Sequence, residues 1–365
     1  MPRTSEAEPR GGREAPGATS RPVRDRARAA RPFRGTLADM MVRAVRVHVL
    51  GGPEVLRVEE VELRPPGPGE ARVRHRAIGV NFIDTYHRSG LYALPTLPHG
   101  IGMEGAGIVE ELGEGVTEVK VGDRVAYVAG PPGSYSEARN VTASRLVRIP
   151  PNVRDDLAAA VMLKGMTVEY LIHRTFPVAP GMTVLWHAIA GGVGLLAAQW
   201  LSHLGVTVIG TTSSESKAAL ATEHGCTHVI DYTREDVVAR VRELTDGRGV
   251  PVVYDSVGKT TFDVSLDCLS RRGMLVGFGN ASGVPAPFDP MVLAKKGSLF
   301  YTRASLFDYV VTRAELLESA SKVFGVMGRG AVKVHVGQTF ALDEARACHE
   351  ALESRGTRGA TVLTP

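Results

Sequence analysis

The sequence predicts an α/β chain in which a β-rich domain is followed by a domain built on a doubly wound parallel sheet. Three observations lead to this prediction. Strand-sized apolar runs separated by Gly and Pro clusters fill the region before residue 155, strands then alternate with helical segments, and a glycine-rich turn joins the first of those strands to its helix. The chain has 365 residues, which is sufficient for two domains of ordinary size.

Residues 1–40 differ from the rest of the chain in composition. They carry nine Arg, no Lys and five acidic residues, whereas the remaining residues have equal numbers of basic and acidic side chains. We expect a disordered N-terminal extension, because the segment lacks a hydrophobic period. It is either a dispensable tail or the product of an upstream start codon, and its acidic residues argue against a transit peptide. The neutral remainder gives no reason to expect nucleic-acid binding.

Cysteine usage and hydropathy indicate the compartment. Cys226, Cys268 and Cys348 lie far apart, which argues against a disulfide framework and against a four-cysteine zinc lobe. No apolar run reaches the ~18 residues of a membrane span. We therefore expect a cytoplasmic protein that does not enter a membrane.

The first predicted domain is formed by short strands. Gly51-Gly52-Pro53 and the Pro- and Gly-rich segment 65–69 separate the first three of them. Two helical segments, 155–163 and 167–174, follow this domain. The predicted strands are 42–50, 55–61, 71–78, 107–112 and 123–126.

The second predicted domain alternates strands with helices, which is typical of a parallel sheet with helical crossovers. Its strands are 183–186, 206–209, 229–230, 251–255, 274–277 and 298–301, and the helices between them are 193–204, 216–224, 235–244 and 262–269. The final region, 314–365, is expected to return to the first domain.

A glycine-rich turn follows the first strand of the parallel sheet and begins its helix. Its residues are Gly191, Gly192, Val193 and Gly194, while Ile189 stands where the full G-x-G-x-x-G fingerprint has its first Gly. Glycines here let the backbone approach a pyrophosphate, and the helix N-terminus supplies free N–H groups. A tight turn that only packs the helix on the strand is the alternative, and the repeated strand-helix units favour the cofactor site.

The end of the second strand favours NADPH over NADH. An NAD site usually has an acidic residue there, whereas this sequence has small hydroxyl side chains and Lys217. Ser213, Lys217 and Tyr232 suit a 2′-phosphate. Lys217 as a solvated helix residue is the alternative, and Glu215 is assigned to the first turn of the helix, where an acid is favourable.

Nine short segments together resemble a known family. They include Asn81 within 79–86 and Lys164 within 163–167, and the others are 51–56, 88–92, 121–125, 187–194, 254–258, 278–280 and 353–355. On these segments the chain resembles the zinc-independent quinone oxidoreductases of the medium-chain dehydrogenase/reductase superfamily, over about residues 42–365. The resemblance implies a GroES-like catalytic domain at 41–165 and 305–365, a Rossmann NADPH-binding domain at 166–304, and a homodimer. Strand 298–301 is either an edge strand that pairs with its twin or a covered edge of the sheet.

The same resemblance explains why no metal is expected. Zinc-dependent members of the superfamily have Cys where Asn81 stands and His where Met103 stands. An amide and a thioether are poor zinc ligands compared with thiolate and imidazole.

The resemblance also implies roles for individual residues. Gly191 to Gly194 would hold the pyrophosphate, Ser213, Lys217 and Tyr232 the 2′-phosphate, and Arg355 would reach the cofactor from the other domain. Asp84 is either part of the site or a loop cap. The remaining cofactor-binding residues would be Phe82, Ile83, Thr85, Lys164, Tyr170, Ser256, Phe278, Gly279 and Asn280.

The implied reaction is NADPH-dependent reduction of a quinone by hydride transfer. Its product is a phenolate whose conjugate acid has a pKa of roughly 10, so a few hydrogen-bond donors replace the metal. Asn81, Tyr92 and Tyr86 are the candidate catalytic donors, and for Tyr92 a wall residue is an equal alternative. Reduction of an enone or enoyl C=C bond is the second enzymatic hypothesis. A non-catalytic NADPH-binding structural or RNA-interacting protein is the hypothesis from another class.

Overall fold

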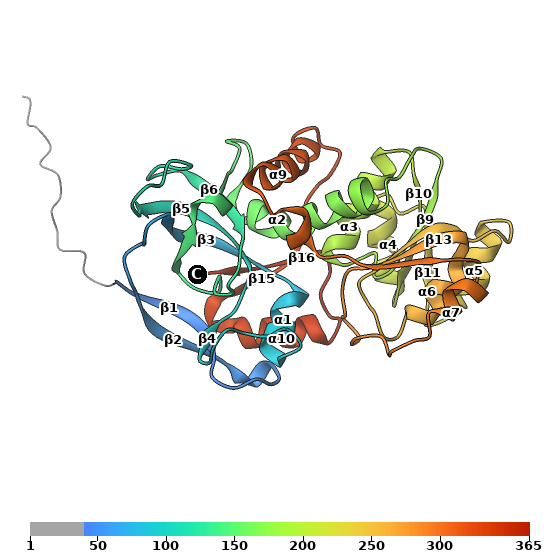
Figure 1. The fold of residues 1–365 in the computed structure, drawn as a ribbon, viewed down its shortest axis with the longest axis horizontal. Coiled ribbons are helices and arrows are strands. Elements are labelled where there is room, and N and C mark those ends of the chain that lie inside the picture. Colours follow the sequence, from blue (N-terminus) through green and yellow to red (C-terminus); the bar gives the residue numbers. More distant parts are fainter. Residues whose placement is uncertain (1–39) are drawn as a thin grey trace, which may run out of the picture. The chain divides into compact units, whose positions relative to one another are not determined.

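The computed structural model describes residues 40–365, so the extension expected at 1–40 lies outside the described residues except for Met40. Figure 1 shows an antiparallel β-rich region, drawn in blue to green, and a parallel sheet with helices, drawn in yellow to orange. The two are connected by helix α2 (Asp155–Tyr170) and by the returning C-terminal segment. The predicted fold class is therefore confirmed.

The β-rich domain contains two sheets. The smaller has the order β2-β1-β4, and the larger has the order β15-β16-β3-β5-β6-β8, with β7 paired to β3. Strand β16 pairs antiparallel with β3 at Val362 and Gly79, which confirms that the C-terminal region returns to this domain. The strands are β1 (Met40–Val47), β2 (Leu56–Leu63), β3 (Glu70–Val80), β4 (His99–Gly100), β5 (Glu104–Leu112), β6 (Arg124–Val128), β7 (Ala138–Thr142), β8 (Val147–Arg148), β15 (Val336–Ala341) and β16 (Ala360–Thr364).

The second domain has one six-stranded sheet in the order β11-β10-β9-β12-β13-β14, and all of its pairings are parallel. The first strand in sequence therefore lies in the middle, and the chain order reverses beside it, where doubly wound sheets bind ligands. The strands are β9 (Thr183–Trp186), β10 (Thr207–Thr212), β11 (His228–Asp231), β12 (Val250–Asp255), β13 (Leu269–Gly277) and β14 (Phe300–Arg303). The crossover helices are α3 (Gly192–His203), α4 (Glu215–Glu223), α5 (Val237–Leu244) and α6 (Phe262–Cys268).

Helix α2 corrects one sequence prediction. The segments 155–163 and 167–174 are not separate helices, because α2 continues without a break into the π-helical turn η3 (Leu171–Thr175). Gly165, between the two predicted segments, lies where α2 packs on α9 (Arg313–Gly328): a Cβ on Gly165 would be 2.7 Å from Val323 Cγ1. The glycine is therefore explained by close helix packing, and the domain boundary predicted at 165/166 falls inside α2.

Helix α2 also carries much of the shared core. It packs on β3 and β5 of the first domain and on α3 of the second. Its apolar residues belong to the same core cluster as Trp186 and Tyr254 of the parallel sheet. One apolar cluster is therefore shared by the two domains, and each domain has further clusters of its own.

Several short elements were not predicted from the sequence. The most important is α1 (Phe82–Ser89), which begins with a capping box between Asn81 and Asp84 and ends at Gly90, whose φ is 85°. A left-handed residue of this kind commonly ends a helix. The other short elements are η1 (Pro53–Val55), η2 (Ala143–Arg145), α7 (Met291–Lys295), α8 (Leu306–Tyr309), η4 (Leu342–Glu344) and α10 (Ala345–Glu353).

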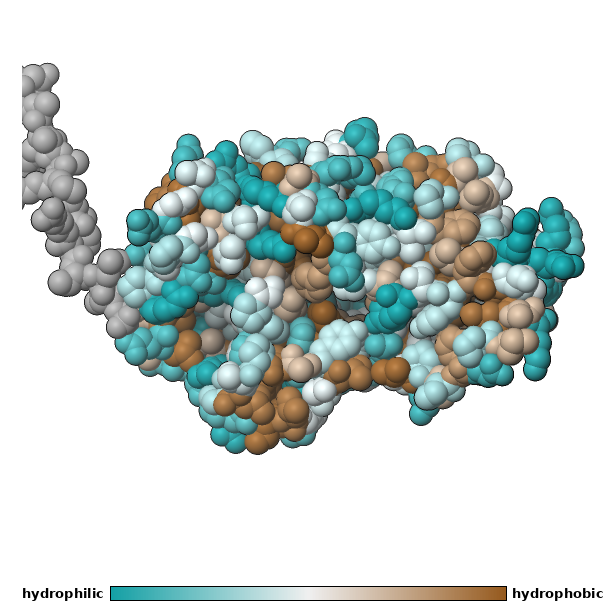
Figure 2. All heavy atoms as spheres, in the orientation of Figure 1, coloured by the Kyte–Doolittle hydropathy of each residue, from teal (hydrophilic) through white to brown (hydrophobic). Residues whose placement is uncertain are grey.

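The surface shows one apolar gathering on the face drawn in Figure 2, at its lower left, over the segment between β1 and η1. Val49 and Leu50 in that segment are 60% and 48% exposed. Elsewhere on this face, hydrophilic and apolar residues are interspersed. Among residues 40–365, no helix is long and apolar enough to cross a bilayer.

Candidate active site

The glycine-rich turn has the geometry of a phosphate-binding turn. Strand β9 ends at Trp186, and α3 begins at Gly192 after an extended Gly191. A Cβ on Gly194 would lie 2.3 Å from the Ile189 carbonyl oxygen, and one on Gly192 would lie 3.0 Å from Lys164 Cδ. Gly194 is therefore required by close approach, whereas Gly192 leaves little room for a side chain. The N-terminus of a twelve-residue helix lies beside them.

Ile189 explains the missing first glycine of the fingerprint. Its side chain is fully buried, and a Cβ on Gly210 of β10 would lie 2.6 Å from Ile189 Cγ2. The apolar side chain therefore fills the space under the turn, and the small residue required for this contact is on the neighbouring strand.

A cluster of cations lies beyond the end of β10. Lys217 Nζ donates to the Arg355 carbonyl oxygen at 2.7 Å, and Arg355 Nη1 donates to the Tyr232 hydroxyl at 3.5 Å. Arg358 Nη2 donates to Ser216 Oγ at 2.9 Å. Burial lowers the pKa of Lys217, and the charges of Arg358 and Arg355 lower it further. In these bonds Lys217, Arg355 and Arg358 contact only neutral oxygen atoms. Their positive charges are therefore available to an anion.

The structure brings Lys217, Tyr232 and Arg355 together and adds Arg358, which sequence reasoning missed. Arg358 is three residues after Arg355 in the segment that returns to the first domain. The presence of this second Arg, three residues after the first, is the feature of the sequence that could have indicated a role for Arg358. Ser213 lies in the loop that follows β10, close to Lys217 in the chain.

Asn81 is fixed by two buried carboxylates. Its backbone N–H donates to Asp84 Oδ2 at 2.8 Å, and its side-chain Nδ2 donates to Glu104 Oε2 at 2.8 Å. Glu104 also accepts from the Leu163 backbone N–H at 2.7 Å and from Lys164 Nζ at 3.4 Å. The fully buried Glu104 carboxylate therefore holds Asn81 and Lys164 beside each other, a role that sequence reasoning did not assign to it.

Asp84 acts as the cap that was one of its two predicted roles. It belongs to the capping box of α1 and also accepts from the Tyr135 hydroxyl at 3.0 Å. Burial raises the pKa of Asp84 to about 7, against the lowering effect of the Asn81 N–H and the Tyr135 hydroxyl.

Two tyrosines of the first domain contact the ends of strands in the second. The Tyr86 hydroxyl accepts from the Asn280 backbone N–H at 2.8 Å, and the Tyr92 hydroxyl accepts from Arg303 Nη2 at 3.1 Å. The two rings meet edge to face at 5.3 Å between centroids. Burial raises the pKa of Tyr86 to about 12, so its hydroxyl stays protonated at neutral pH.

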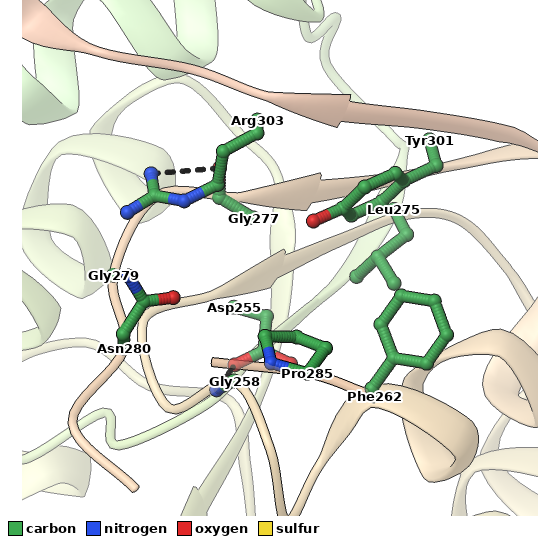
Figure 3. A pocket seen from close by; sticks show the side chains of 10 residues that line it. All are labelled: Asp255, Gly258, Phe262, Leu275, Gly277, Gly279, Asn280, Pro285, Tyr301 and Arg303. Atoms are coloured by element: carbon green, nitrogen blue, oxygen red, sulfur yellow. Dashed lines mark hydrogen bonds between the residues drawn. The ribbon is translucent and has the colours of Figure 1, made fainter. Parts of the chain in front are cut away.

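The ends of β12, β13 and β14 form a small hollow, shown in Figure 3, in which the side chains of Asn280 and Arg303 lie on the same side. A Cβ on Gly279 would lie 2.5 Å from the Ser256 carbonyl oxygen, so the loops after β12 and β13 touch. Phe278 packs against Trp186 at 5.6 Å between ring centroids. The structure thus groups Ser256, Phe278, Gly279 and Asn280 at one edge of the sheet.

Other predicted residues have different partners. Phe82 is partly buried against the apolar core of the first domain, and the Thr85 hydroxyl donates to the Phe82 carbonyl oxygen at 2.8 Å. Tyr170 stacks on Tyr309 at 4.3 Å, and burial raises its pKa. Ile83 and Val193 are half-buried. Cofactor contact by these residues remains a prediction.

Asn81 and Met103 stand where zinc-dependent members of the superfamily have metal ligands, and Asn81 belongs to this site. Asn81 is bonded to Glu104, and Met103 is 4% exposed. Among the described residues, no three His, Cys, Asp or Glu side chains are grouped as metal ligands. His187 lies between the hydroxyls of Thr211 and Ser265, each at 3.0 Å, as an ordinary buried polar residue.

Two family models match the chain. "Alcohol dehydrogenase GroES-like domain" matches residues 67–151, and "Zinc-binding dehydrogenase" matches residues 192–319. The second range covers β10 to β14 of the parallel sheet. Asn81 and Met103, the positions at which zinc-dependent members have ligands, lie in the first range.

Individual relatives match over nearly all of the described chain. A quinone oxidoreductase of Pseudomonas aeruginosa is 51% identical over 89% of this chain and its own full length. The 2-haloacrylate reductase of a Burkholderia species is 46% identical over 89% of this chain and 99% of its own. The crystal structure of Escherichia coli quinone oxidoreductase complexed with NADPH superimposes with a TM-score of 0.87, at 46% identity over 88% of this chain and all of that one. The chain therefore belongs to the quinone oxidoreductase family of the medium-chain dehydrogenase/reductase superfamily.

Proposed function

We propose that this protein reduces quinones with NADPH in the space between α1 and the ends of β12, β13 and β14. The observation that carries the proposal is the arrangement of Asn81, Glu104 and Lys164, in which an amide held by a buried carboxylate stands where zinc-dependent relatives have a thiolate. The 51% identity to a quinone oxidoreductase supports the same assignment.

The residues present fit NADPH. The turn at Gly191 to Gly194 offers the free N–H groups of the first turn of α3, and three of its four residues have no side chain, which suits a pyrophosphate. Lys217, Arg355 and Arg358 offer the cationic cluster that a 2′-phosphate requires. When bound, NADPH supplies the hydride, and the protein supplies binding, orientation and charge stabilisation.

The donors are oriented by the bonds they already make. Because the Tyr86 hydroxyl accepts from Asn280 and the Tyr92 hydroxyl accepts from Arg303, each keeps its own hydrogen available for a substrate oxygen. Asn81 uses one amide hydrogen on Glu104 and keeps the other. A quinone oxygen that gains negative charge needs donors of this kind in a site that excludes water.

Steady-state kinetics with quinones and enones, each with NADPH and with NADH, test the proposal. We expect quinones with NADPH to give the highest kcat/KM, and Asn81→Ala and Tyr92→Phe each to lower kcat for quinones. If neither substitution changes kcat, the donor assignment is wrong. Absence of turnover with any acceptor would favour the non-catalytic NADPH-binding alternative.

Reduction of activated C=C bonds is a second candidate function. The supporting observation is the 46% identity to a 2-haloacrylate reductase over almost the whole of both chains. The electronic requirement is similar, because hydride adds to a conjugated acceptor and negative charge collects on oxygen.

We also propose that the protein is a cytoplasmic homodimer that binds neither nucleic acid nor membranes. Strand β14 is at the edge of the six-stranded sheet, and its Phe300 is 56% exposed. Open edges of this kind pair with other strands. Cys226, Cys268 and Cys348 are all free and buried, as expected in a reducing compartment. Light scattering at micromolar concentration should give twice the chain mass, and Phe300→Asp should shift it towards the monomer.

A further inference from the structure

Arg303, the last residue of β14, is held as a fixed cation at the candidate substrate site. Its Nη1 donates to the Ala304 carbonyl oxygen at 2.9 Å and to the Gly277 carbonyl oxygen at 3.4 Å. Its Nη2 donates to the Tyr92 hydroxyl at 3.1 Å. Figure 3 shows the guanidinium lying over the same hollow as the Asn280 side chain. Two backbone carbonyls therefore orient the guanidinium, and its Nη2 contacts the Tyr92 hydroxyl.

The charge of Arg303 is not used by the protein itself. Its acceptors among the described residues are neutral oxygen atoms. Asp255 also lines the hollow, but its carboxylate already accepts from two backbone N–H groups and from the hydroxyls of Thr261 and Ser265. A guanidinium without an anionic partner, fixed in a hollow, is suited to a ligand carboxylate.

The influence of this cation extends across the site. Burial raises the pKa values of Tyr86 and Tyr170, and the Arg303 charge lowers both, so the guanidinium lies within electrostatic reach of both hydroxyls. Tyr86 and Tyr92 are the donors assigned above to the substrate oxygen. Arg303 is therefore close to the hydroxyls that would donate to the substrate oxygen as it gains negative charge.

We propose that Arg303 and Tyr92 form a carboxylate subsite, and that the protein reduces alkenes conjugated to a carboxylate in addition to quinones. The inference rests on the proposed substrate site and deepens its second candidate function. In the reaction, a new C–H bond forms at the β-carbon with hydride from NADPH, and the C=C electron pair moves towards the carboxylate. A proton from solvent then adds to the α-carbon, so that alkenoate, NADPH and H⁺ give alkanoate and NADP⁺.

The charge balance explains why this substrate class needs Arg303 when a quinone does not. A neutral quinone gains one negative charge, which hydrogen-bond donors stabilise. A carboxylate already carries one charge and gains a second in the enolate, so a nearby cation has a much larger effect on the barrier. Arg303 is thus a specificity-determining residue for anionic acceptors.

The test compares 2-chloroacrylate with uncharged 2-chloroacrylamide and with 1,4-benzoquinone. We expect the unsubstituted protein to reduce all three, and Arg303→Gln to lower kcat/KM for the acid about 10- to 100-fold, as expected for a lost charged hydrogen bond. The amide and the quinone should lose less than the acid and by similar factors, because they lose only the hydrogen bond that Arg303 donates to the Tyr92 hydroxyl. Arg303→Lys should recover part of the loss, and Arg271→Gln, at the opposite end of β13, should behave as the unsubstituted protein.

A binding measurement makes the test independent of turnover. Calorimetric titration of 2-chloropropionate into the protein with NADP⁺ should give a Kd that Arg303→Gln raises at least 10-fold and Arg271→Gln leaves unchanged. Quinone reduction without reduction or binding of the acid overturns the carboxylate subsite and leaves the proposed quinone reduction intact. Equal losses for acid and amide in Arg303→Gln also overturn it.

Discussion

Glu104 shows how much of the site depends on one buried side chain. Its carboxylate accepts hydrogen bonds from Asn81, from the Leu163 backbone and from Lys164, and it is fully buried. Buried polar networks of this kind require that every member be satisfied. We therefore propose that Glu104 is a positioning residue, which would act on the substrate through Asn81 and Lys164.

We expect Glu104→Gln to lower kcat/KM for quinones about 10- to 100-fold, because an amide has one acceptor oxygen in place of two and removes the negative charge beside Lys164. Steady-state kinetics checks the result. A positioning role also predicts that the slope of kcat against pH changes, which a purely structural loss would not produce. The matched control is Glu110→Gln, which removes a partly exposed ion pair with Arg74. Normal activity in Glu104→Gln would contradict the assignment.

The cluster of Lys217, Arg355 and Arg358 predicts a preference for NADPH over NADH. Lys217→Ala and Arg358→Ala should each raise KM for NADPH about 10-fold and leave KM for NADH nearly unchanged, because only NADPH carries the 2′-phosphate. Lys120→Ala, at an exposed turn, is the control. An equal change in KM for NADPH and NADH would show that these cations do not bind the 2′-phosphate.

At the scale of elements, sequence reasoning identified the parallel sheet better than the site around it. All six strands of that sheet were predicted because short apolar runs alternate with longer helical segments, although the last strand is Phe300–Arg303 and not 298–301. Helix α1 was missed because it is short and its capping box resembles a turn in sequence. Glu104, Arg303 and Arg358 were not assigned functions, since their partners are 23 to 211 residues away in the chain and only tertiary structure brings them together.

The contact of α2 with α9 can be tested with a pair of glycines. Gly165→Ala places a methyl group 2.7 Å from Val323 Cγ1, whereas Gly328→Ala in α9 meets no atom within 4 Å. Overpacking of a core costs about 1 to 3 kcal/mol, so Gly165→Ala should lower the free energy of unfolding by that amount. Gly328→Ala should leave it unchanged or raise it, because Ala is the better helix former. Urea denaturation checks both variants, and similar values for the two would contradict the packing argument.

At the scale of the whole molecule, buried histidines link stability to pH. Burial lowers the pKa of His75 to about 4 and of His87 to about 4, and burial together with Arg88 lowers that of His349 to about 3. Below their ordinary value of about 6.5, the unfolded chain binds protons that the folded chain does not. Burial raises the pKa of Asp84 to about 7, which has the opposite sign because the folded chain then binds the extra proton.

Burial also lowers the pKa values of His173 and His187, so five histidines oppose Asp84. We therefore expect the free energy of unfolding to be lower at pH 5 than at pH 7. The contribution of the histidines is complete above pH 6.5 and is lost as the pH falls towards about 4. Urea denaturation at the two pH values measures the difference. His75→Gln should make the difference smaller, and a protein that is more stable at pH 5 would contradict the sign.

The segment that joins α10 to β16 has a consequence for how the molecule is made. Its Arg355 and Arg358 belong to the cation cluster, and its Gly359 donates to the Ala190 carbonyl oxygen at 3.1 Å, against the glycine-rich turn. The ribosome adds these residues only after the entire parallel-sheet domain has been synthesised, and domains fold largely as units during synthesis. The sheet can therefore form on a growing chain before the cation cluster is complete. If that cluster holds the 2′-phosphate as proposed, we expect NADPH to bind with full affinity only when β16 has joined β3, so that cofactor retention would report that the two ends of the fold have met.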